Sequence, residues 1–142
     1  MRSIFIDLID TKTEDVKTFL THLCGDPAIE VEVWNYPGPA EECVLMVSCH
    51  DYSEYDPEEF NEKIKAIGKI PTVCICVDIT GRVPGDKETN EFCKKVLKHF
   101  KGFASDDYTE HAWSLKEIEE GAIISGHPFF DYRGWYEQSK NR

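Results

Sequence analysis

The sequence predicts an α+β fold, a ferredoxin-like β-α-β-β-α-β plait extended by an additional C-terminal helix, a short strand and an aromatic tail. Three observations lead to this class. Strongly β-forming runs alternate with amphipathic segments of helical period, a Pro-Gly-Pro turn separates two of those runs, and 142 residues suit one domain spanning 1–142. The composition, 41% hydrophobic and 30% charged, is that of an ordinary globular protein.

The first half of the chain predicts a strand, a helix and a hairpin. Residues 3–9 are rich in Ile, Phe and Leu and predict a buried strand. Thr11 to Glu14 has capping-box spacing, and apolar residues then recur at helical spacing until Gly25. Residues 29–36 alternate apolar and acidic side chains, which predicts a strand with one wet face, and residues 43–49 predict its buried return strand.

The second half of the chain predicts two more strands and three more helices. Asp56-Pro57-Glu58-Glu59 starts a helix that ends before Gly68. Residues 71–79 predict a third long strand, and a helix begins near Asp86 or Thr89. A short strand at 103–105 and a short helix from Ser114 to Gly121 follow, and then a tail rich in aromatic residues.

The charge of the chain limits its function. Sixteen Lys and Arg residues face 27 Asp and Glu residues, which gives a net charge of −11. Because this field repels phosphates, we expect no direct nucleic-acid binding and favour a basic protein partner. No apolar run reaches the roughly 18 to 20 residues of a membrane span, and acidic residues interrupt the N-terminal run before a signal-peptide core forms. We therefore expect a cytoplasmic protein without membrane contact, whose six cysteines are reduced.

One segment holds the whole net charge. Residues 18–62 contain eleven Asp and Glu residues and no Lys or Arg. A solvated face that keeps the protein soluble is one interpretation, and a binding face for a basic partner is the one we favour, because aromatic residues lie among the carboxylates. The expected charge partners and aromatic anchors are Glu41, Glu42, Asp51, Glu54 and Asp56, with Trp34, Tyr36, Tyr52 and Tyr55.

A second cluster predicts a different kind of site. Asp106, Asp107 and His111 follow a predicted strand, and two carboxylates with an imidazole suit a divalent metal or acid–base chemistry. The alternative is a polar loop in which an aspartate caps local backbone and His111 packs beside Trp113.

Two further features have structural and functional interpretations. Cys74 and Cys76 share one face of a predicted strand, and we interpret them as core residues because no Cys-x-x-Cys or paired-His spacing accompanies them. The aromatic stretch 127–136 either seals the edge of the core or forms a recognition surface.

Two stretches carry a resemblance. VDITGRVPGD (77–86) and GFASDDYTEHAWSLKEI (102–118), together with residues 127–136, resemble small bacterial immunity proteins of polymorphic toxin systems. The resemblance covers roughly the second half of the chain. It implies an antitoxin that binds and blocks a cognate toxin, often a nuclease, with no catalysis of its own.

The expected function is therefore that of a cytosolic immunity protein, a monomer or weak dimer without cofactor or metal, whose acidic face pairs with the cationic cleft of a basic toxin. Two alternatives remain. One is a metal-dependent enzyme that uses the Asp106, Asp107 and His111 cluster, and the other is a dimeric regulatory domain of the ferredoxin-like type.

Overall fold

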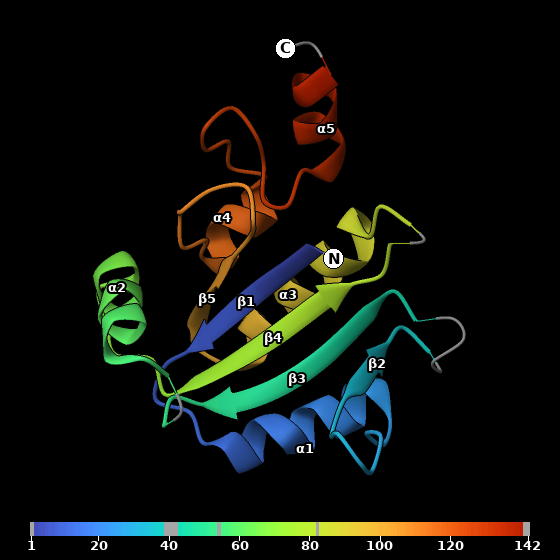
Figure 1. Ribbon diagram of the computed structural model, residues 1–142, viewed down its shortest axis with the longest axis vertical. Helices are drawn as coiled ribbons and strands as arrows, with labels where there is room; N and C mark the ends of the chain where they lie inside the picture. The colour runs from blue at the N-terminus through green and yellow to red at the C-terminus, as the bar shows by residue number, and fades with distance from the viewer. Residues whose placement is uncertain (1, 39–42, 54, 82, 141–142) are drawn as a thin grey trace.

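The computed structural model describes residues 2–38, 43–53, 55–81 and 83–140. Its centre is an open, antiparallel five-stranded sheet with the order β2-β3-β4-β1-β5 (Figure 1). The strands are β1 (Arg2–Leu8), β2 (Trp34–Tyr36), β3 (Leu45–Asp51), β4 (Val73–Ile79) and β5 (Gly102–Ser105). The helices are α1 (Thr13–Cys24), α2 (Pro57–Ile67), α3 (Asp86–His99), α4 (Leu115–Glu120) and α5 (Tyr132–Lys140). None of these helices is long and apolar enough to cross a bilayer.

The predicted α+β class is confirmed, whereas the ferredoxin-like plait is not. In a ferredoxin-like plait, whose sheet is antiparallel, the first and third strands are direct neighbours. Here β4 lies between them, so that Val77 of β4 is opposite Ile4 on one side and opposite Val47 on the other. A fifth strand, β5, pairs with the far side of β1. The order of elements along the chain matches the prediction, but the order of strands in the sheet does not.

The hydrophobic core lies between one face of this sheet and helices α1 and α3. Alternate residues of the long strands face it, since successive side chains in a strand point to opposite faces. Val16 and Leu20 of α1 and Phe92 and Val96 of α3 are fully buried against these strands. Figure 1 shows α3 behind β1 and β4, with no helix in front of the centre of the sheet. The sheet therefore has one face covered by α1 and α3, called here the inner face, and an outer face that is open at its centre but covered at Asp7 and Cys74, which are buried there.

The sequence predicts the N-terminal caps of α2 and α4 correctly and that of α1 wrongly. Asp56 caps α2 by accepting a 2.8 Å hydrogen bond from the backbone N–H of Glu58, and Ser114 and Glu117 form the predicted capping box of α4. The capping box predicted for α1 is wrong. Its N-cap is Lys12, without a side-chain cap, because the hydroxyl of Thr11 donates to the carbonyl of Ile9 instead.

The strand predicted over 29–36 exists only as the three residues of β2. The side chain of Ile29 is 100% exposed and that of Val31 is 69% exposed, and both lie in a turn. The backbone N–H of Glu32 donates to the carbonyl of Ala28, and the Glu32 carboxylate pairs with the Lys17 ammonium at 2.8 Å. This local turn and ion pair take the place of the strand pairing that the alternation of apolar and acidic residues predicted here.

The aromatic tail is ordered as a buried segment followed by a helix. Phe129 and Phe130 are buried in the core, which confirms that these rings seal its edge. Residues 132–140 form α5, a helix that the sequence reasoning missed. Arg2 ties this segment to the first strand, because its guanidinium lies 4.3 Å from the centroid of the Tyr132 ring.

Candidate functional site

Helix α2 is the element that presents acidic side chains most openly. Pro57 occupies the first turn and Gly68 ends the helix in a left-handed conformation, as both residue types favour. None of its described residues is buried, and Figure 1 shows it beyond the end of the sheet, away from α1 and α3. Glu58 and Glu59 stand in its first turn, where the helix dipole stabilises negative charge.

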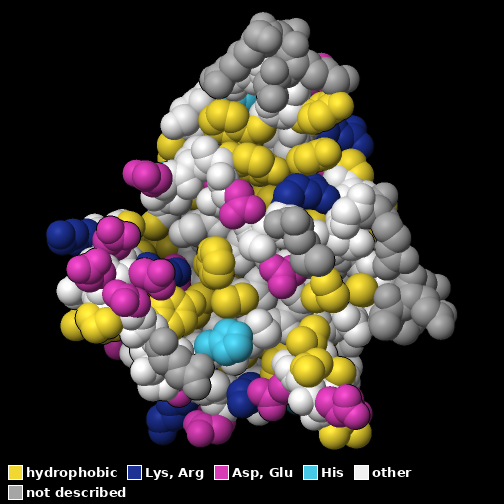
Figure 2. All heavy atoms as spheres, viewed as in Figure 1, with side chains coloured by type: hydrophobic (Ala, Val, Ile, Leu, Met, Phe, Trp, Pro, Cys, Tyr) yellow, Lys and Arg dark blue, Asp and Glu magenta, His cyan; other side chains and the backbone are white. Residues whose placement is uncertain are grey.

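One basic side chain of α2 points inward rather than to solvent. The ammonium of Lys63 lies 3.1 Å from a carboxylate oxygen of Asp7 on β1, whose side chain is only 2% exposed. Tyr52 donates a hydrogen bond to the same carboxylate. Because the charge of Lys63 is paired with this buried carboxylate, it does not neutralise the glutamates on the outer side of α2. Figure 2 shows acidic side chains gathered over this helix.

The acidic helix borders a hollow of about 730 Å³. Glu59, Glu62, Lys63, Lys65 and Ala66 line it from α2, and Glu110 lines it from the loop that follows β5. Three carboxylates from two segments distant in the sequence thus surround one concave surface. We call Glu58, Glu59, Glu62 and Glu110 the acidic rim.

The structure separates the predicted aromatic anchors into two groups. Trp34 and Tyr36 lie on the inner face of β2, where their side chains are 1% and 4% exposed. The prediction that they contact a partner is therefore corrected: both are core residues. The indole N–H of Trp34 donates to Thr21 of α1 at 3.1 Å, and the hydroxyl of Tyr36 donates to Glu91 of α3.

The other predicted partner residues lie at or near α2. Tyr52 and Tyr55 are partly buried in the connection before α2, with ring centroids 4.6 Å apart, and burial raises the pKa of both phenols. Asp51 is exposed, and the hydrogen bonds from Ser53 lower the pKa of its carboxyl. Asp56 is exposed but caps α2. Glu41, Glu42 and Glu54 lie outside the described residues.

The second predicted cluster is a set of structural contacts. Asp106 is buried, and its carboxylate accepts hydrogen bonds from the backbone N–H groups of Thr109 and Phe130 at 3.0 and 2.9 Å. Asp107 accepts from the backbone N–H of Ser3 at 2.8 Å. His111 contacts the Glu117 carboxylate at 3.0 Å, and its ring meets Trp113 edge-on. These contacts match the polar-loop alternative.

No metal centre forms around these side chains within the described ranges. There, no group of three or more His, Cys, Asp or Glu residues is placed to hold a metal ion. The hypothesis of a metal-dependent enzyme built on Asp106, Asp107 and His111 thus gains no support from the geometry.

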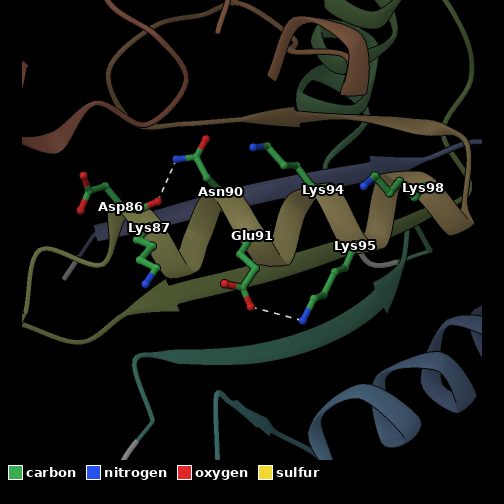
Figure 3. A pocket seen from close by; sticks show the side chains of 7 residues that line it. All are labelled: Asp86, Lys87, Asn90, Glu91, Lys94, Lys95 and Lys98. Atoms are coloured by element: carbon green, nitrogen blue, oxygen red, sulfur yellow. Dashed lines mark hydrogen bonds and ion pairs between the residues drawn. The ribbon is translucent and has the colours of Figure 1, made fainter. Parts of the chain in front are cut away.

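A second hollow, of about 510 Å³, follows the outer side of α3 and differs in charge from the first. Figure 3 shows Lys87, Lys94, Lys95 and Lys98 around it. Lys95 pairs with Glu91 at 3.2 Å, and Lys98 lies 3.8 Å from Glu119 of α4. Asp86 and Glu91 line the same hollow, so its four lysines outnumber its carboxylates, whereas carboxylates outnumber lysines in the hollow beside α2.

Sequence reasoning missed two contributors to this arrangement. Glu110 was not assigned to the acidic surface, and no local signal links it to α2, since the two meet only through the tertiary fold. Lys63 was not assigned a role either. The signal for its role is its position in an amphipathic helix. Lys63 stands four residues after Glu59 and one before Ile64, at an inward-facing position.

Comparison of the chain with protein-family models, with curated proteins and with solved structures finds no match. The resemblance to immunity proteins therefore rests on the sequence stretches alone.

Proposed function

We propose that this chain is a cytosolic immunity-type protein that binds a basic toxin of the nuclease class through the acidic rim. The observation that supports the proposal best is the grouping of Glu59, Glu62 and Glu110 on one surface, since carboxylates gathered there attract a basic partner. The resemblance of residues 77–86 and 102–118 to immunity proteins points the same way.

Electrostatics favours a partner of this class. A nuclease must hold phosphates in a cationic cleft, and carboxylates can take the positions of those phosphates. Lys63 and Lys65 also line the hollow, but the Lys63 ammonium is paired with Asp7, so the three carboxylates there face one lysine outside that pair. The basic hollow along α3 would repel the same partner, so the two charged sides select one orientation of approach.

Tyr52 and Tyr55 give this surface its candidate apolar contacts. Both rings are partly exposed and lie directly before the acidic helix. Partly buried aromatic residues lose little conformational freedom on binding and dominate the energetics of many interfaces. In this proposal the carboxylates accelerate association, and the tyrosines slow dissociation.

The test compares three tagged proteins as bait in lysate of the source organism. They are the wild type, the rim variant E58Q/E59Q/E62Q and the control variant E14Q/D15N/E120Q. Both variants remove three exposed acids, two of them from the first turn of a helix. We expect the wild type and the control to retain one basic protein in equal molar amount, and the rim variant to bind it about 10- to 100-fold more weakly at low salt.

A second measurement tests whether the chain inhibits the captured protein or only binds it electrostatically. The captured protein should degrade nucleic acid when alone, and the wild-type chain should suppress that activity at a one-to-one ratio. Equal loss of binding in both variants would show that only net charge matters, and a captured protein that is acidic or retains its activity when bound would refute the proposal.

A further inference from the structure

Two thiols lie side by side on the open outer face of the sheet. Cys74 and Cys76 are two residues apart on β4, so both point to the same face, and their sulfur atoms are 3.9 Å apart. Cys74 is fully buried, whereas Cys76 is partly exposed. The interpretation of both as core residues thus holds for Cys74 and not for Cys76.

The cross-strand neighbours give the two sulfurs different surroundings. Cys76 is opposite Phe5 of β1 and Ser48 of β3, which are uncharged. Cys74 is opposite Asp7 and His50, and the Asp7 carboxylate is buried beside it. A negative charge is therefore disfavoured on Cys74 and is better placed on Cys76.

Groups from two further segments complete the site. The Lys63 ammonium of α2 lies 5.0 Å from the centroid of the Phe5 ring and 5.8 Å from that of Tyr55. The charged and titratable groups that face the thiol pair are therefore these, by segment: Asp7 of β1, His50 of β3, Asp78 of β4, Tyr52 and Tyr55 of the connection, and Lys63 of α2.

These contacts favour the thiolate of Cys76. The hydrogen bond between the two sulfurs lowers the pKa of Cys76 most, and Lys63 and the hydroxyl of Tyr55 lower it further, against burial and the charge of Asp78. The pKa of Cys74 is raised by the hydrogen bond to Cys76, by burial and by Asp7. The buried Asp7 carboxylate opposite Cys74 and the partial exposure of Cys76 thus favour the proton on Cys74 and the charge on Cys76.

We propose that Cys76 is a reactive thiolate that hydrogen peroxide or a small organic peroxide oxidises, with Cys74 as its fixed hydrogen-bond donor. The sulfur attacks one peroxide oxygen, the O–O bond breaks, and the sulfur takes up an OH group to become a sulfenic acid. The sulfur loses two electrons to the peroxide, and the departing hydroxide or alkoxide takes a proton from water.

Cys74 acts as a donor in this proposal and not as a disulfide partner. A disulfide bond is about 2 Å long, whereas the two sulfurs are 3.9 Å apart on one flat strand. The proposal concerns chemistry on the outer face of the sheet and does not depend on a partner at the acidic rim.

The first test is alkylation of the wild-type protein by iodoacetamide as a function of pH. Cys24 serves as an internal control, because it is also a free, partly buried thiol, and burial raises its pKa to about 11. At about pH 7 we expect Cys76 to react at least roughly tenfold faster than Cys24, with a midpoint below the ordinary thiol value of about 8.5. Tandem mass spectrometry of the tryptic peptide 70–82 distinguishes Cys76 from Cys74.

A pair of variants then tests the role of Cys74. C74A removes the donor, and the midpoint for Cys76 should rise by about one pH unit. C74S keeps a hydroxyl donor in the same place, and its midpoint should stay close to that of the wild type. Circular dichroism spectra equal to that of the wild type would show that both variants are folded.

The last test uses hydrogen peroxide with dimedone as a trap for sulfenic acid. We expect the adduct on Cys76 in the wild type and in C74S, less of it in C74A and none at this peptide in C76S. Equal alkylation of Cys24 and Cys76, a midpoint at or above about 8.5, or a dimedone adduct spread evenly over the cysteines would overturn the proposal.

Discussion

Two buried carboxylates show how single residues of this acidic chain serve the fold. Asp7 is held by the ammonium of Lys63 and the hydroxyl of Tyr52, and Asp106 by backbone N–H groups. Burying a charge is costly unless its partners replace the lost water. Because each carboxylate has such partners, neither is free for a binding or catalytic role. The acids of α2, by contrast, are exposed and remain available for binding.

Removing one partner of a buried ion pair leaves the other charge buried without compensation, which gives a prediction for Lys63. K63M leaves Asp7 buried without its cation, and we expect it to lower the free energy of unfolding by about 2–4 kcal/mol. K65M on the exposed side of the same helix should change it by less than about 0.5 kcal/mol. Urea denaturation followed by circular dichroism measures both. A double variant K63M/D7N should recover part of the loss, and a K63M protein as stable as K65M would contradict the prediction.

At the scale of elements, α2 shows how a helix without buried residues is kept in place. Its apolar residues Phe60 and Ile64 are only partly buried, so its stability depends on its ends and on the Lys63 contact. The N-terminal cap by Asp56 is the contact that the sequence predicted correctly. Asp56 therefore has a structural role in addition to its charge.

Two substitutions at Asp56 separate these roles. D56A removes the cap and should lower the free energy of unfolding by about 1 kcal/mol. D56N keeps an acceptor at the cap and removes the charge, so it should leave stability within about 0.5 kcal/mol of the wild type. Chemical denaturation of both variants beside E58Q, which keeps the cap, is the measurement. Equal losses in D56A and D56N would mean that the charge, and not the cap, stabilises the helix.

Most elements could be predicted from the sequence, because their signals are local. The cap of α2, the capping box of α4 and the apolar run of β4 each involve neighbouring residues. The length of β2 could not be predicted from the sequence. The alternation of apolar and acidic residues at 29–33, which predicted a strand, is also compatible with a turn fixed by a contact to Lys17. The position of β4 between β1 and β3 depends on pairing between distant segments, which periodicity does not encode.

The candidate site was predictable only in part, for the same reason. The excess of acid in 18–62 is a property of the sequence, and it pointed to α2 and its flanks. The burial of Trp34 and Tyr36 depends on which face of β2 meets α1 and α3. The approach of Glu110 to α2 depends on how the loop after β5 returns over the sheet.

At the scale of the whole molecule, the C-terminal segment joins elements from both ends of the chain. Phe130 donates its backbone N–H to Asp106, and Tyr132 lies against Arg2 of β1. His127 fixes the next turn. Its ring contacts the Asp131 carboxylate at 2.9 Å and the Gln138 side chain at 2.8 Å, and it stacks on Trp135 at 4.1 Å between centroids. Two acceptors on the two ring nitrogens suit the protonated imidazolium.

Docking of α5 should therefore depend on pH. The hydrogen bond to Asp131 and that to Gln138 raise the pKa of His127 in the folded state. A raised pKa of a base stabilises the fold fully below the unfolded value of about 6.5 and no longer does so once the pH has risen through the folded value. The stability difference between the wild type and H127Q should thus be larger at about pH 5.5 than at about pH 8.5. Thermal unfolding at both values measures it.

The exposed H22Q variant is the control for this pH series, since His22 of α1 is exposed to solvent. A dependence on pH that H22Q shares with H127Q would not be assigned to the contacts of His127. A difference for H127Q that grows with pH would show that the neutral ring, and not the cation, is the form that holds α5.

The lengths of the strands limit how the protein can self-associate. Three strands of seven residues form the middle of the sheet, but its two outermost strands, β2 and β5, have three and four residues. The backbone of Ala104 in β5 is already paired with that of Trp113, through hydrogen bonds of 2.8 and 2.7 Å. An unpaired strand margin is the template on which chains add to one another into aggregates. With Ala104 paired on one side, the margin left for another chain on the other side is the three residues of β2 and the last four residues of β3, which β2 does not reach.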